Sequence, residues 1–95
     1  MDLFPGIVFR DGPAGRRAGV AGGPDVWEVI EVFQAEGSNR SEAAANLGVR
    51  PGLVDAAIAY HRAHRDEIDG WIAANAEMMS AAREASIADP ASAAG

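Results

Sequence analysis

The side chains best equipped for chemistry are arginines in the middle of the chain, because a guanidinium can pair with a phosphate or a base edge. Arg50 stands at the predicted start of a helix and can donate to either group. Arg40, Arg62 and Arg65 are suited to hold phosphates at the edges of a duplex. With Ser41, these arginines form the predicted DNA-binding set. The alternative, that they are solvated surface, stays equally open.

The remaining residues that would face a DNA groove offer less. They include Pro51, Gly52 and Ala56, which carry no donor, and Asp55, which would repel the phosphate backbone. We therefore expect weak DNA binding by a monomer. A dimer would double the footprint.

A second arginine group, Arg10, Arg16 and Arg17, lies in the first twenty residues. It could grip phosphates as a basic ribbon, or it could protect a strand edge against aggregation. The second interpretation is favoured.

Two histidines, His61 and His64, lie three residues apart and could form a metal pair. No cysteine supports such a site, so a surface pair is the better interpretation. The chain also has no phosphate-binding glycine loop, nucleophile elbow or convincing base–nucleophile set. We expect a protein that is not an enzyme and needs no cofactor.

Composition describes one small domain. The chain has 95 residues, of which 48% are hydrophobic and 23% charged, with a net charge of −6. Residues 1–65 hold seven arginines against eight acids, and residues 66–95 hold one arginine against six acids. The back of the chain is thus acidic. The net charge argues against a simple nucleic-acid binder.

The environment expected from the sequence is the cytoplasm. Absence of cysteine fits a reducing compartment. No apolar run approaches the roughly 20 residues of a membrane span. The first residues lack the features of a signal peptide.

The first 23 residues are predicted to form a hairpin arm. Residues 6–10 and 16–20 read as strands around the turn residues 11–15. An isolated hairpin is marginal in water, so it should pair with another chain or lie on helices. A helix should follow, with Asp25 and Glu28 as a capping box and with Val26, Ile30 and Phe33 in its apolar face.

The strongest pattern covers residues 40–59. Ser41 is predicted to cap a short helix over 42–47, which Gly48 ends in the left-handed conformation. Pro51 should begin a third helix that runs to about His64, with Val54 and Ala57 facing its neighbour. This spacing favours a helix-turn-helix within residues 24–65. The alternative is a generic helical hairpin.

A fourth, acidic helix is predicted over residues 66–87, followed by a disordered tail over 88–95. Its half near Ile68 and Trp71 should pack on the core, and its half from Met78 onward should be free. The predicted partner-binding residues are Trp71, Ile72, Met78, Met79 and Arg83. The predicted fold is therefore mainly α: a helix-turn-helix bundle with an N-terminal β-hairpin and an extra C-terminal helix.

Several segments resemble a known family. They are GIVFRDGPAGRRA at 6–18, GGPDVWEV at 22–29, AAIAYH at 56–61 and DEID at 66–69. Over about residues 6–84 the chain resembles the actinobacterial branch of the VapB-like antitoxins, domain-of-unknown-function family four-three-three. One departure is Gly22-Gly23-Pro24, which stands where many relatives carry Gly-Thr-Arg.

The resemblance implies a three-helix, homeodomain-like fold with an N-terminal β-hairpin. It also implies an antitoxin that neutralises a PIN-like ribonuclease encoded next door and represses its own operon. Since such ribonucleases hold an acidic metal centre, Arg83 could reach into it as a cation. The alternatives are a stand-alone transcriptional regulator and a dimeric interaction module without a DNA role. We expect a homodimer in each case, because the hairpin leaves strand edges unpaired and the core is thin.

Overall fold

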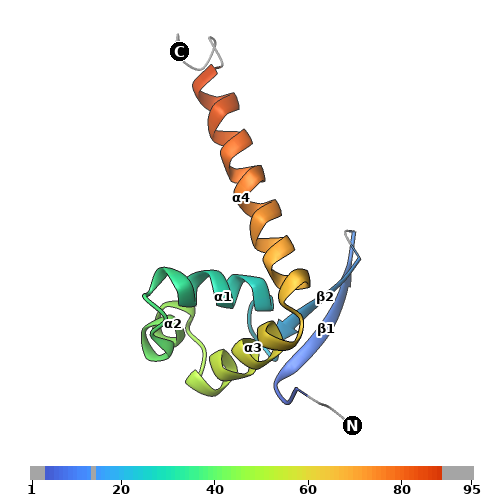
Figure 1. The fold of residues 1–95 in the computed structure, drawn as a ribbon, viewed down its shortest axis with the longest axis vertical. Helices are drawn as coiled ribbons and strands as arrows, with labels where there is room; N and C mark the ends of the chain where they lie inside the picture. The colour runs from blue at the N-terminus through green and yellow to red at the C-terminus, as the bar shows by residue number, and fades with distance from the viewer. Residues whose placement is uncertain (1–3, 14, 89–95) are drawn as a thin grey trace.

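The computed structural model describes residues 4–13 and 15–88, which form four helices and one two-stranded antiparallel sheet (Figure 1). The strands are β1 (Ile7–Gly12) and β2 (Gly15–Val20). The helices are α1 (Val26–Ala35), α2 (Arg40–Leu47), α3 (Pro51–Ala63) and α4 (Arg65–Ala88). The predicted mainly helical class with an N-terminal hairpin is confirmed. Of the predicted disordered tail, Ala88 ends α4, and the rest lies outside the described residues.

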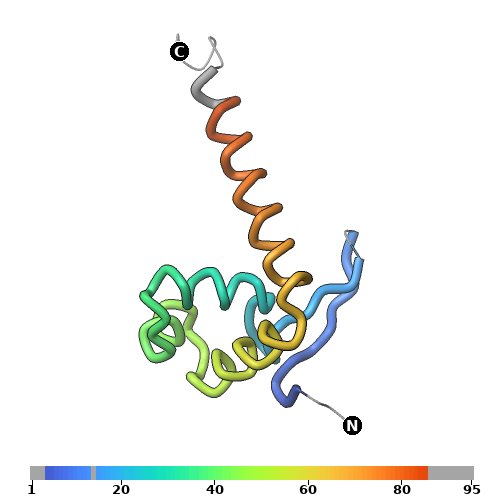
Figure 2. Tube along the Cα trace, in the orientation of Figure 1, coloured from blue at the N-terminus to red at the C-terminus, as the bar shows by residue number. Residues whose placement is uncertain are grey.

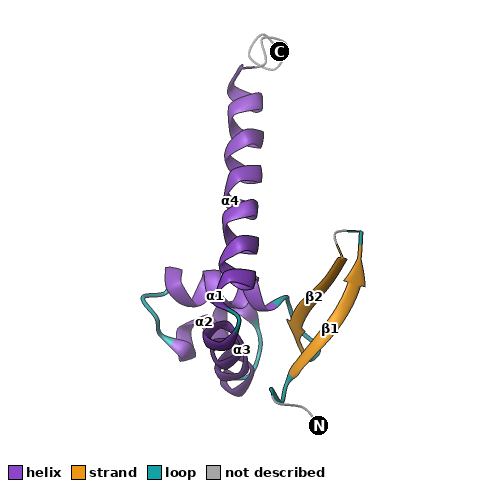
Figure 3. Cartoon of the chain, turned by 45° about the vertical axis from the view of Figure 1, so that its right-hand side comes forward, coloured by secondary structure: helices purple, strands orange, loops and turns teal. Residues whose placement is uncertain are grey.

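The hairpin lies against helices, as one of the two sequence-based alternatives proposed. Both strands contact α3, and β2 also contacts α1 (Figure 3). Ile7, Ala18 and Val20 are buried, so each strand contributes side chains to the core shared with the helices. The strands pair from Ile7 opposite Val20 to Gly12 opposite Gly15, a longer ladder than residues 6–10 and 16–20 suggested.

The core sits where α1, α2 and α3 meet. Its fully buried side chains include Val26 and Ile30 of α1 and Val54 of α3, as their spacing predicted. Ala43 and Ala44 of α2 are buried as well, and their small size lets α2 pack closely on its neighbours. Phe33, which was predicted to lie in the apolar face of α1, is only partly buried at the margin of the core, as are Leu47 and Ile58.

The turn between α2 and α3 follows the prediction. Gly48 caps α2 with a φ of 69°, which is the left-handed region that favours glycine. Pro51 stands in the first turn of α3, where a missing amide hydrogen costs nothing.

The predicted helix caps were wrong in two places. Asn39, rather than Ser41, caps α2, because its side chain accepts a hydrogen bond of 3.0 Å from the Glu42 amide. Asp25 does occupy the N-cap of α1 but makes no side-chain cap bond there. Its carboxylate instead pairs with two arginines of the hairpin.

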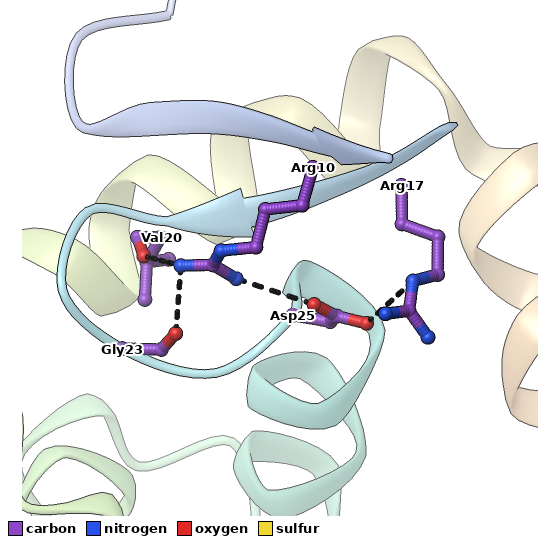
Figure 4. Close-up of polar contacts among 5 residues, drawn as sticks. All are labelled: Arg10, Arg17, Val20, Gly23 and Asp25. Atoms are coloured by element: carbon purple, nitrogen blue, oxygen red, sulfur yellow. Dashed lines mark hydrogen bonds and ion pairs between the residues drawn. The ribbon is translucent and has the colours of Figure 1, made fainter. Parts of the chain in front are cut away.

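Figure 4 shows how Asp25 fastens the hairpin to α1. Its Oδ1 accepts from Arg10 Nη1 at 3.2 Å, and its Oδ2 lies 3.5 Å from Arg17 Nε. Arg10 Nη2 also donates to the carbonyls of Val20 and Gly23, at 2.8 and 2.9 Å. Since Arg10 and Arg17 stand directly opposite in the ladder, the buried carboxylate between them offsets their repulsion.

Gly19 is required by this arrangement. A Cβ at this position would overlap the guanidinium of Arg10, which crosses the face of β2. The hairpin arginines Arg10 and Arg17 therefore have an internal structural role, which neither sequence-based interpretation foresaw. Arg16 differs, because its guanidinium covers the ring of Phe9 at 4.0 Å.

Replacing Asp25 by Ala should lower the free energy of unfolding by about 3 kcal/mol, because two guanidiniums lose their shared, buried partner. Urea denaturation measures this change. The control is Asp11→Ala, which removes an exposed acid of β1 and should stay within about 0.5 kcal/mol of wild type. Equal losses for the two variants would contradict the role assigned to Asp25.

Candidate functional site

Helix α4 leaves the bundle after its first two turns and extends away from it (Figures 1 and 2). Ile68 is buried, and Ile72 packs against the core. Farther along, Met78 and Met79 are 65% and 59% exposed, so no part of the described chain covers them. The predicted division of this helix into an internal half and a free half is confirmed.

A groove of about 250 Å³ lies at the point where α4 leaves the bundle. Trp27 of α1 and Trp71 of α4 line it, and Met78 continues its apolar surface outward. We call this the Trp groove, and its complete lining is Arg17, Trp27, Trp71, Ala74, Asn75 and Met78. Of the predicted partner-binding residues, the structure brings together Trp71 and Met78. Arg83 is exposed farther out on α4.

Sequence reasoning missed the contribution of Trp27. It stands next to the apolar stripe of α1 and is half-buried, so its spacing alone left its role open. A tryptophan at the margin of a stripe can cover a neighbouring helix, and here α4 is that neighbour.

The junction between α3 and α4 holds the outer helix in place. The Tyr60 hydroxyl donates to both carboxylate oxygens of Glu67, at 3.1 and 2.9 Å. His61 Nε2 lies 2.8 Å from Asp69 Oδ1. His64 stacks on the Tyr60 ring at 4.5 Å, and Phe4 meets that ring edge-on at 5.3 Å. The two histidines thus have different neighbours rather than a common ligand.

No group of three potential metal-ligating side chains occurs within residues 4–13 and 15–88.

A second surface lies on α2 and α3. Gly52, Asp55, Ala59 and Arg62 are all exposed and recur at intervals of three and four residues, so they share one side of α3. We call this the α3 face. Arg50 is exposed at the N-cap of α3, next to it.

Asp55 is the residue of the α3 face with a fixed geometry. Arg40 Nε donates to its Oδ1 at 2.8 Å, and Arg40 Nη2 donates to its Oδ2 at 2.7 Å. This hydrogen-bonded guanidinium lowers the pKa of Asp55 and keeps it ionised. The predicted phosphate ligand Arg40 is therefore already paired across α2 and α3. No sequence spacing signals a pair 15 residues apart.

The other predicted DNA-binding residues are exposed and are spread over α2, α3 and the start of α4. Ser41 is exposed in the first turn of α2, and Arg65 is exposed at the first position of α4. Along the sequence, residues 37–65 hold four arginines and two acids, a balance of +2. The remaining residues hold four arginines and twelve acids, a balance of −8.

Comparison of the chain with family models, with curated proteins and with solved structures gives no match. The resemblance to the VapB-like antitoxins stays a prediction. Among the described residues, no helix has the length and apolar character needed to cross a membrane.

The Tyr60–Glu67 contact predicts a shifted titration. Burial, then the hydrogen bond to Glu67, raises the pKa of Tyr60 from 10.0 to about 12. A pKa raised by folding stabilises the protein below pH 10, and this contribution is lost as the pH rises toward 12. Since the chain has one tyrosine, tyrosinate absorbance should show a midpoint near pH 12 when native and near 10 in denaturant.

Glu67→Gln should lower the native midpoint, because the carboxylate that accepts from Tyr60 is removed. Asp66→Asn is the matched control and should leave the midpoint unchanged. A native midpoint near 10 would show that the hydroxyl is free.

Proposed function

We propose that this protein is the antitoxin of a type II toxin–antitoxin pair, which binds and neutralises a PIN-like ribonuclease. The observation that carries the proposal is the exposed apolar surface of α4, where Met78 and Met79 are 65% and 59% exposed beside the Trp groove. Exposed large apolar side chains next to an apolar groove are typical of protein-binding surfaces.

The surface suits a helix-sized or loop-sized apolar partner. Two indole rings offer rigid contact area, and the thioethers of two adjacent methionines adapt to irregular surfaces. Glu77 and Glu84 flank the methionines on α4 and favour a partner with basic residues at the rim. The family resemblance supplies the identity of that partner, and Arg83 is the cation available to its acidic centre.

DNA-binding autorepression forms the second part of the proposal. In it, α1 to α3 act as a homeodomain-like helix-turn-helix, with α3 as the recognition helix of a homodimer. The observation that favours it is the local balance of +2 over residues 37–65. A cytoplasmic regulator without a toxin partner is the alternative function, and it needs only this second surface.

Serine at both Met78 and Met79 should weaken binding of the neighbouring-gene ribonuclease about tenfold or more, because the apolar area that the partner buries is lost. Calorimetry with the purified ribonuclease measures the affinity. The control combines Ala73→Ser with Ser80→Ala, two exposed positions whose spacing places them on the side of α4 away from both methionines. Similar losses in the two double variants would place the partner elsewhere.

Ending the chain after Glu77 tests the same surface more severely. The shortened chain should keep its cooperative thermal transition in circular dichroism, because Met78 and Met79 are mostly exposed and lie outside the buried core, and it should no longer co-purify with the ribonuclease. Retained co-purification would contradict the proposal. Loss of the transition would show that the outer half of α4 belongs to the core.

A further inference from the structure

The Arg40–Asp55 pair stands on the surface that the proposed helix-turn-helix would turn toward DNA. An exposed ion pair contributes little to stability, and this one lies at half-exposed side chains. Its geometry is nevertheless well defined, since two parallel N–H···O bonds of 2.8 and 2.7 Å join guanidinium and carboxylate. Stability therefore gives a weak reason for the pair, and its position suggests another.

The pair changes what Asp55 can do next to a nucleic acid. An isolated carboxylate on the α3 face would be repelled by phosphates, whereas one neutralised by Arg40 is not. Each carboxylate oxygen has a second lone pair, so Asp55 can still accept a hydrogen bond from outside. In the major groove, the N4 amino group of cytosine is the donor that Asp and Glu side chains accept from.

The neighbours of Asp55 permit a close approach. Gly52 and Ala59 lie one turn on either side of it along the α3 face, and both are exposed. A Cβ at Gly52 would meet nothing within 4 Å, so no contact inside the chain requires glycine there. Glycine in a helix costs about 1 kcal/mol relative to alanine. A glycine at this exposed position leaves room for another molecule to approach α3 closely.

We propose that Asp55 is a specificity-determining residue, which accepts from the cytosine amino group of a G·C base pair while Arg40 holds and neutralises it. Arg40 is then a positioning residue, and Arg50 remains the donor at the start of α3. The inference rests on the DNA-binding part of the proposed function and adds the base that the α3 face selects.

The test is selection of the full-length protein on a pool of DNA duplexes with a randomised central segment, followed by sequencing. Wild type should enrich sites with an invariant cytosine. Asp55→Asn should lose that preference about tenfold while the preferences at other positions remain, because the amide is uncharged and pairs its acceptor with a donor, a combination that suits adenine rather than cytosine. Glu42→Gln, which changes an exposed acid of α2, should select the same sites as wild type.

The outcomes separate the two levels of the proposal. If Asp55→Asn selects the same bases as wild type, the inference is overturned, but DNA binding itself still stands. Binding without any base preference also overturns it. No binding to any duplex overturns the DNA-binding function, and the inference with it.

Two further variants test positioning and approach. Arg40→Ala should weaken binding to the selected duplex about tenfold and make it less dependent on salt, because the interface loses one positive charge, and it should reduce the cytosine preference, because Asp55 is no longer held. Gly52→Leu should also weaken binding about tenfold, whereas Gly70→Leu, at an exposed glycine of α4 with equal room, should not. Equal effects of the two leucines would contradict a close approach at Gly52.

Discussion

The buried carboxylate of Asp25 is the constraint on which the arrangement of the elements depends. It receives Arg10 and Arg17 from opposite strands while it occupies the N-cap of α1, so one side chain joins the sheet to the helices. A two-stranded sheet is not stable alone, and the ion pair, together with Ile7 and Val20, holds it on the bundle. Arg17 also lines the Trp groove, which links this junction to the proposed binding surface.

The two proposed binding surfaces lie on segments of opposite net charge. Residues 37–65 carry the balance of +2 and present the α3 face, whereas the acidic remainder includes α4. The contact between Tyr60 and Glu67 fixes the angle at which α4 leaves α3, and burial of Ile68 secures its first turns. A partner on the outer half of α4 and a duplex on α3 would therefore contact different elements of the chain.

Much of this architecture could be predicted from residue patterns. Gly48 ends α2 and Pro51 begins α3 because of their own backbone preferences. The apolar stripes of α1 and α3 follow from the helical spacing of their residues. What the sequence left open depends on tertiary contact. Asp25 has the spacing of a capping box, yet two arginines of the hairpin compete for it and win. The Arg40–Asp55 pair and the approach of Trp27 to Trp71 join distant segments, which no local pattern encodes.

Amide hydrogen exchange on the free protein and on its complex with the proposed ribonuclease partner tests the central claim most directly. In the free protein, residues 73–85 should exchange fast and residues of the core, such as Val29 and Val54, slowly, because the outer half of α4 has only its own helical bonds. The account predicts that the complex gains protection in residues 73–85 and around Trp27. Protection gained on β1 or on the α3 face instead, with α4 unchanged, would contradict it.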